Sequence, residues 1–140
     1  MKGLVLAAGL ALATSLAVAC DWEIARDEVS PMDDTRTCMI YSEAASLGVS
    51  VRGQNVTFLT GSAYRDGRDA LQVRIDENEA IGLGRRDRST GSYEDGARRA
   101  LAEIRSGQRL RVSYLDYPSA RQGDAPICTL PQLIDSCLSP

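Results

Sequence analysis

The chain has 140 residues, with 16 lysines and arginines against 19 aspartates and glutamates, and a formal net charge of −3. A protein that binds nucleic acid is normally basic, with its positive charge collected on one face. Here charges of both signs are mixed along the chain, which argues against a nucleic-acid partner. The chain has no histidine, and this absence excludes the nucleophile–histidine pairs of many hydrolases.

Residues 1–19 predict an export signal. Lys2 makes a short basic start, residues 3–17 are uncharged and mostly apolar, and Ala17-Val18-Ala19 supplies the small residues that a signal peptidase requires. The apolar run is shorter than the roughly 20 residues that a membrane-spanning helix needs. We therefore expect a periplasmic or secreted protein, in which residues 20–140 form a single domain without a transmembrane span.

The cysteines of the chain all follow this leader: they are Cys20, Cys38, Cys128 and Cys137. An even number of cysteines in an exported protein indicates disulfide bonds, and four cysteines allow 3 pairings. We expect sequence neighbours to pair, with the Cys128–Cys137 bond favoured most, because each neighbouring pair lies near one end of the chain. A zinc site is the weaker alternative, since the chain has no histidine and no CxxC pair, and we expect no metal and no cofactor.

Cys20 has a second possible role. The run Leu16-Ala17-Val18-Ala19-Cys20 resembles a degenerate bacterial lipobox, in which the cysteine is lipidated and becomes the first residue. Two features oppose lipidation: a strand-like pattern begins at once at Trp22 instead of a flexible tether, and one of the other cysteines would lose its partner. We expect plain secretion and keep a membrane-anchored lipoprotein facing the periplasm, with its lipid on Cys20, as the alternative.

Alternation of apolar and polar residues predicts short β-strands in the first half of the exported chain. In the first of them, Trp22, Ile24 and Val29 are expected to face a core. Proline, glycine and aspartate predict turns at 30–34 and 53–54 and a loop at 61–69. The predicted strands cover residues 21–29, 37–44, 49–52, 55–60, 71–76 and 79–84.

One helix is predicted at 92–106, after an irregular arginine-rich loop at 85–91. Ser92 is expected to cap it, with Asp95 completing a capping box. Gly107 is expected to end it in the left-handed conformation. Its apolar face has the helical spacing i, i+3, i+4 and i+7, and consists of Ala97, Ala100, Leu101 and Ile104.

The last part of the chain predicts a strand at 109–117, in which Leu110, Val112 and Tyr114 alternate with Arg111 and Ser113. It also predicts a short strand around 127–129 and a short helix that begins at Pro131. Many short strands, one mid-chain helix and one short C-terminal helix together predict a mainly β, β-sandwich-like fold with helical decoration.

The order of these features resembles the invasion-associated locus B family of small exported proteobacterial proteins. The resembling elements are Asp21-Trp22-Glu23-Ile24, the segment 33–38, Arg74-Ile75-Asp76, and the late helix, strand and closing helix up to Leu138. The resemblance implies a β-rich exported protein and carries over no catalytic residue, because the family has no agreed active site. The chain departs from the family pattern at its first cysteine, which precedes Trp22 instead of following it.

The acidic clusters all have local structural explanations, so we expect no catalytic carboxylate. Asp33 and Asp34 lie in a predicted turn, and Glu94 and Asp95 lie in a predicted first helical turn, where acids suit the helix dipole. The run 76–79 offers oxygen ligands but lacks the spacing of a calcium loop, so a solvated hairpin turn is the favoured interpretation.

Arg85, Arg86 and Arg88 form the basic cluster of the chain and are the candidate contact with an anionic surface or an acidic partner. We expect a non-catalytic exported envelope protein that binds or protects a partner, which is an unknown envelope protein or an anionic surface. A periplasmic inhibitor or immunity protein and a small-ligand or lipid-binding protein are the alternatives, and an enzyme is the least favoured class.

Overall fold

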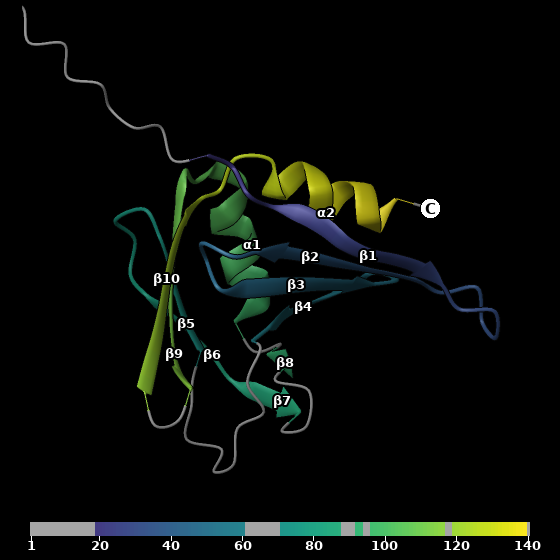
Figure 1. The fold of residues 1–140 in the computed structure, drawn as a ribbon, viewed down its shortest axis with the longest axis horizontal. Coiled ribbons are helices and arrows are strands. Elements are labelled where there is room, and N and C mark those ends of the chain that lie inside the picture. The colour runs from purple at the N-terminus through teal and green to yellow at the C-terminus, as the bar shows by residue number, and fades with distance from the viewer. Residues whose placement is uncertain (1–18, 61–70, 88–91, 94–95, 117–118, 140) are drawn as a thin grey trace, which may run out of the picture.

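The computed structural model describes residues 19–60, 71–87, 92–93, 96–116 and 119–139 (Figure 1). They form two antiparallel sheets, with strand orders β1-β2-β3-β4-β8-β7 and β10-β9-β5-β6, and two helices. The prediction of a mainly β fold with one mid-chain and one C-terminal helix is confirmed. The elements are β1 (Glu23–Val29), β2 (Arg36–Ser42), β3 (Leu47–Arg52), β4 (Asn55–Leu59), β5 (Leu71–Ile75), β6 (Ile81–Leu83), β7 (Arg85–Asp87), β8 (Ser92–Tyr93), α1 (Ala97–Ser106), β9 (Arg109–Asp116), β10 (Ser119–Pro126) and α2 (Leu130–Leu138).

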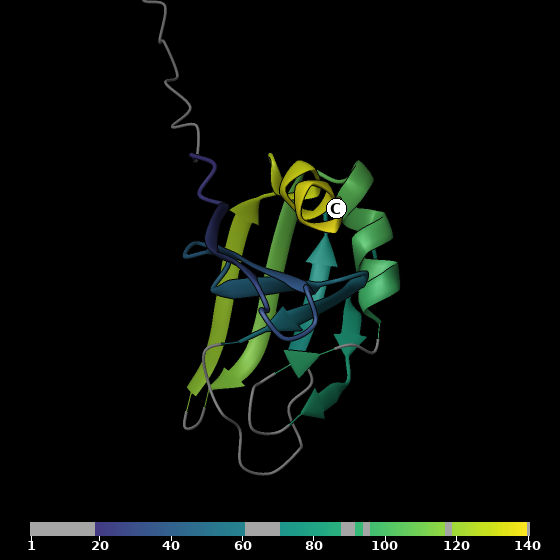
Figure 2. The ribbon, with the colours of Figure 1, turned by 90° about the vertical axis from the view of Figure 1, so that its right-hand side faces the viewer.

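The two sheets face each other across the core, and their strands run in different directions. In Figure 1 the strands of the smaller sheet stand upright, whereas β2, β3 and β4 run across the view. Helix α1 packs against β4, β5 and β6, so it joins the two sheets at one side, and α2 packs against β2 and β3 at one end (Figure 2). Within the described residues no helix is long and apolar enough to cross a membrane.

The smaller sheet follows the predicted alternation closely. In β5 the side chains of Leu71, Val73 and Ile75 are buried, and in β9 Leu110 and Val112 are buried beside them. Successive side chains of a strand point to opposite faces, so the residues between these core positions lie on the outer face of the sheet. The sequence pattern therefore predicts both the strands and the faces that they present.

The first strand is predicted correctly in position and wrongly in burial. Trp22, just before β1, is buried, and its indole Nε1 donates a hydrogen bond to the Pro126 carbonyl at 2.9 Å. Ile24 and Val29 are 36% and 60% exposed, although both were expected in the core. β1 is an edge strand, and its register with β2 shifts between Ile24 and Arg26. Such a bulge breaks the strict alternation on which the expectation depended.

Helix α1 begins five residues later than predicted, at Ala97. Ser92 lies in β8, paired with Leu59, and is not the cap; Asp95 lies outside the described residues. The N-cap is Gly96, whose φ of 77° favours glycine. Three members of the predicted apolar face are buried, whereas Leu101 is only half-buried and packs at the edge of the core.

Gly107 ends α1 as predicted, but not in the left-handed conformation. Its φ of −91° and ψ of 171° are extended. The position requires glycine because a Cβ there would lie 2.3 Å from Ile75 Cγ2. The residue is therefore determined by packing of the helix end against β5.

The C-terminal region differs from the prediction in its last strand. The segment 127–129 is the turn before α2, and the strand is β10, in ladder register with β9 from Ser119 opposite Asp116 to Pro126 opposite Arg109. The composition of β10 does not suggest a strand, and pairing with β9 produces it. The predicted loops also change: 85–87 is the short strand β7, while 61–69 and 88–91 lie outside the described residues.

The disulfide bonds join opposite ends of the chain, so the expected pairing of sequence neighbours is wrong. Cys20 bonds to Cys128 and Cys38 bonds to Cys137, across 108 and 99 residues, with a Cα–Cα distance of 5.9 Å in each pair. The reason is tertiary: α2 packs against β2, which brings the last cysteine beside the second. The Sγ atom of Cys20 is thus occupied, and this is the atom that would carry a lipid.

Candidate functional site

Polar side chains form two rows across the outer face of the smaller sheet. In the first row, β-sheet pairing places Arg74 opposite Arg111 and Arg111 opposite Asp124. In the second row, Gln72 and Gln122 both lie opposite Ser113. The consecutive strands β9 and β10 and the more distant strand β5 thus bring their polar residues to one surface.

These rows surround a hollow of about 390 Å³, which we call the outer-face pocket. Its volume falls within the range of roughly 300–1,000 Å³ that is usual for small-molecule sites. The pocket is lined by Gln72, Val73, Arg74, Ala80, Arg111, Val112, Ser113, Gln122, Gly123 and Asp124.

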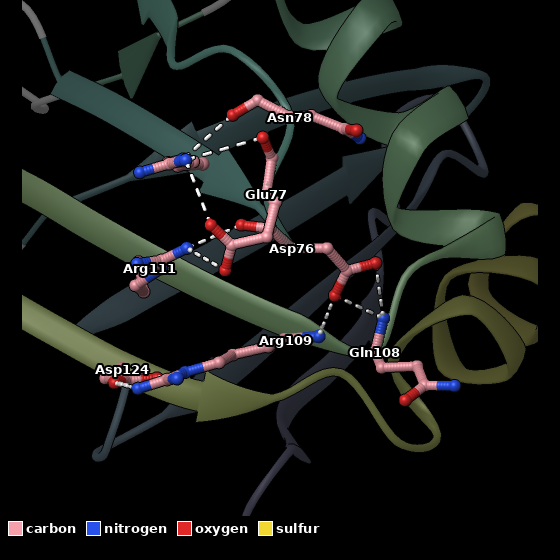
Figure 3. A network of polar contacts seen from close by, with 8 residues as sticks. Asp76, Glu77, Asn78, Gln108, Arg109, Arg111 and Asp124 are labelled. Atoms are coloured by element: carbon pink, nitrogen blue, oxygen red, sulfur yellow. Dashed lines mark hydrogen bonds and ion pairs between the residues drawn. The ribbon is translucent and has the colours of Figure 1, made fainter.

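The two paired arginines share one carboxylate. The Glu77 side chain lies 3.2 Å from Arg74 Nη2. It also lies 3.3 Å from Arg111 Nη2 (Figure 3). Like charges directly opposite each other in a sheet are destabilising, so Glu77 offsets the repulsion between the guanidinium groups. The Glu77 side chain is 86% exposed, and salt bridges at such positions contribute little stability.

Backbone carbonyls of the turn after β5 fix the two guanidinium groups more firmly. Arg74 Nε donates to the Asn78 carbonyl at 2.8 Å, and Arg111 Nη2 donates to the Asp76 carbonyl at 2.5 Å. The Asp76 carboxylate in turn accepts the backbone N–H groups of Gln108 at 3.1 Å and of Arg109 at 2.9 Å (Figure 3). The predicted turn at 76–79 is therefore present and is bonded to the start of β9.

Both arginines retain donors that no described residue accepts from. Among the described residues, the bonds of Arg111 involve Nη2 alone, and its Nε is enclosed without an acceptor. The bonds of Arg74 involve Nε and Nη2, which leaves its Nη1 group. Figure 3 shows the Arg111 guanidinium with one nitrogen turned to the 76–78 turn and the other pointing away from it. An acceptor on a ligand would satisfy donors that are already held in place.

Asp124, which lines the pocket, is paired with Arg109. Arg109 donates to both carboxylate oxygens of Asp124, through Nε at 2.7 Å and through Nη2. These hydrogen bonds lower the pKa of the Asp124 carboxyl below its ordinary value. A general acid needs the opposite shift, so Asp124 is suited to holding charge in place and not to donating a proton.

A second hollow of about 500 Å³ lies between α1 and β4, next to Arg98, Leu101 and Arg105. Arg105 already forms an exposed ion pair with Asp135, with Nη2 and Oδ1 2.7 Å apart. We take the outer-face pocket as the candidate site because strand register there places two guanidinium groups and several uncharged polar side chains around one hollow.

The arginine cluster predicted as the contact site is placed only in part. Arg85 and Arg86 belong to β7, at the edge of the larger sheet, and Arg88 lies outside the described residues. Arg85 and Arg86 therefore belong to a different sheet from the one that carries the outer-face pocket.

The predicted acidic clusters take structural positions where they are described. Asp33 accepts the backbone N–H of Thr35 at 3.1 Å within a turn, and Asp34 has a φ of 56°. Glu94 and Asp95 lie outside the described residues. Within the described part of the chain, no group of three or more histidine, cysteine, aspartate or glutamate side chains is arranged to hold a metal ion.

Comparison of the chain with protein-family models, curated proteins and solved structures finds no match. The fold and the site define a disulfide-linked, mainly β protein with an arginine-lined pocket on the outer face of one sheet. Any statement of its function therefore depends on the geometry of that pocket.

Proposed function

We propose that the chain is an exported, non-catalytic binding protein of the bacterial cell envelope, and that it contacts its partner through the outer face of the smaller sheet. The observation that carries this proposal is the pair of guanidinium groups, Arg74 and Arg111, which line an open pocket and whose Nη1 groups have no hydrogen-bond partner among the described residues. A surface that is rigid and unsatisfied in its hydrogen bonding suits recognition.

Export is supported by the leader-like first nineteen residues and by the two disulfide bonds, since disulfides persist in oxidising compartments outside the cytoplasm. The bond at Cys20 supports secretion over lipidation, because a lipid thioether would need the same sulfur. The resemblance to the invasion-associated locus B family agrees with a small β-rich protein of this compartment.

A binding role is favoured over catalysis by the way the carboxylates are used. Asp76 is engaged by two backbone N–H groups, and Asp124 and Glu77 are engaged by arginines. With no histidine in the chain, these groups are the natural candidates for proton transfer in the pocket, and each already has a structural partner.

The test is site-specific photo-crosslinking in envelope extract. A benzophenone amino acid at Gln122, on the outer face, is expected to yield a discrete adduct. The matched control is the same probe at Gln132, an exposed glutamine on α2. Equal adducts at both positions, or none at Gln122, would show that this face is not the contact surface.

A further inference from the structure

We propose that the outer-face pocket binds a singly charged carboxylate that carries neighbouring hydroxyl groups, as in a hydroxy acid or a uronic acid unit of a polysaccharide. The inference deepens the proposed function and rests on it for the location of the site. It follows from the charge of the pocket, from the arrangement of its donors and from the uncharged residues around them.

The charges around the pocket favour a singly charged ligand over a doubly charged one. Arg74 and Arg111 share one acidic partner, Glu77, while the adjacent Arg109 and Asp124 neutralise each other. The Asp76 carboxylate, which accepts the Gln108 and Arg109 backbone N–H groups, adds a third negative charge, so three carboxylates match the three arginines. A phosphate monoester carries about −1.5 to −2 at neutral pH, so it would place more negative charge beside these carboxylates than a single carboxylate would.

The donors fit a group with two acceptor oxygens. Arg74 and Arg111 occupy directly paired positions on β5 and β9, where Cβ atoms lie about 4.5–5.5 Å apart. Glu77 already accepts from the Nη2 group of each arginine, so a ligand carboxylate would accept from their Nη1 groups. Charge-assisted hydrogen bonds of this kind are among the strongest in proteins. Their other bonds to the 76–78 turn hold both groups in position before a ligand arrives.

The second polar row indicates that the rest of the ligand carries hydroxyl groups. Gln72, Ser113 and Gln122 line the same pocket, and within the described part of the chain no hydrogen bond occupies their side chains. Amides and hydroxyls both donate and accept, so they complement ligand hydroxyl groups. The side chains of Val73 and Val112 are buried in the core, so these residues and Gly123 contribute main chain to the pocket between the polar rows.

The experiment is titration of the purified, disulfide-bonded protein with sodium glucuronate, followed by calorimetry and by amide chemical shifts. Glucuronate is expected to bind, with shifts centred on β5, β9 and β10. Three comparison probes each remove one feature: glucose lacks the carboxylate, acetate lacks the hydroxyls, and inorganic phosphate changes the charge. Each is expected to bind at least about tenfold more weakly. A glucuronate oligomer that binds more tightly than the monomer would identify a polysaccharide as the source, and equal affinity would identify a free acid.

Three variants locate the site. Arg74→Gln and Arg111→Lys are expected to weaken glucuronate binding by about tenfold or more, because each loses a charge-assisted or forked contact. Gln122→Ala, at an exposed position, is expected to weaken glucuronate binding and leave acetate binding unchanged. This variant tests the site even if an arginine variant fails to fold. The matched control is Arg98→Gln, an exposed arginine on α1, which is expected to bind as the wild type does.

The outcomes separate this inference from the function on which it rests. If Gln122 crosslinks a partner but glucuronate does not bind, the ligand class is wrong and the contact surface stands. If phosphate or an aspartate-rich peptide binds more tightly than glucuronate, the monoanionic hydroxycarboxylate is also rejected. If glucuronate binds and Arg98→Gln weakens it as much as Arg74→Gln does, the pocket is not the site.

Discussion

Asp76 stabilises the joint between β5 and β9 in two ways. Its carboxylate accepts the N–H groups of Gln108 and Arg109, and its backbone has a φ of 51°, a conformation that aspartate and asparagine tolerate better than most residues. The same turn supplies the carbonyl groups that hold Arg74 and Arg111. One residue thus links the fold to the candidate site.

Asp76→Ala is expected to lower the free energy of unfolding by about 1–2 kcal/mol, because two N–H groups lose their acceptor and alanine disfavours a positive φ. Asp76→Asn retains an acceptor oxygen and should lose less than half as much. Glu79→Ala, in the same exposed turn, serves as the control and should stay within about 0.5 kcal/mol. Urea denaturation measures the stability of the three variants. An Asp76→Ala midpoint equal to that of Glu79→Ala would show that Asp76 does not stabilise the joint between β5 and β9.

Asp124 predicts a dependence of stability on pH. The hydrogen bonds from Arg109 hold the pKa of Asp124 below its ordinary value of 3.8. A lowered folded-state pKa gives stability that is fully present above the unfolded value and is lost as pH falls through the folded value. Wild type should therefore lose more stability than Asp124→Asn on acidification below about pH 4. The pair is largely exposed, so the difference should remain under about 1 kcal/mol; equal losses in acid would contradict the prediction.

The sequence predicts a helix or strand well where the spacing of apolar residues within the segment determines it. The alternation in β5 and β9 depends only on neighbouring residues, and both strands and their inward faces are predicted correctly. Ser92 is a good helix cap by type, but pairing with β4 places it in a strand. β10 has few strand-forming residues and exists because it pairs along its whole length with β9.

Helix α1 tests the packing of the core between the sheets. Ile104 is fully buried, whereas Leu101 is half-buried, so Ile104→Ala should cost about 2–5 kcal/mol and Leu101→Ala clearly less. Arg98→Ala, on the exposed side of the helix, is the control. Chemical denaturation measures the loss of unfolding free energy in each variant. Equal losses for Leu101→Ala and Ile104→Ala would contradict the packing of α1 described above.

Two glycines of the fold offer a matched comparison. Gly107→Ala brings a Cβ to 2.3 Å from Ile75 and should destabilise by about 1–3 kcal/mol, the usual cost of overpacking. Gly82→Ala meets nothing within 4 Å and should be neutral or slightly stabilising, because alanine restricts the unfolded chain. Thermal unfolding would decide, and a neutral Gly107→Ala would show that α1 can move away from β5.

At the scale of the whole molecule, neither the cysteine pairing nor the candidate site can be derived from local pattern. The outward positions of Arg74 and Arg111 follow from alternation, but their pairing depends on β9 lying between β5 and β10. In the same way, Cys38 meets Cys137 only because α2 packs on β2. The local sequence around each cysteine does not predict contacts between segments about a hundred residues apart.

The two disulfide bonds should differ in their accessibility to reductant. Cys38 and Cys137 are 0% and 4% exposed, whereas Cys20 and Cys128 lie at the surface. Mild reduction of the folded protein, followed by alkylation and peptide mass analysis, should therefore label Cys20 and Cys128 first. Simultaneous labelling of all the cysteines would mean that the protein opens globally before either bond is reduced.

The disulfide arrangement has a mechanical consequence. A pull between residues 20 and 139 would travel through the Cys20–Cys128 bond and along the short stretch that contains α2. The Cys38–Cys137 bond would transmit part of the tension to β2 in the larger sheet, whereas the smaller sheet lies outside this covalent path. About a dozen residues, at roughly 3.3–3.6 Å each, could then extend before the covalent path became taut. An oxidised molecule stretched by its ends would lengthen by only a few nanometres and would keep the outer-face pocket intact under load.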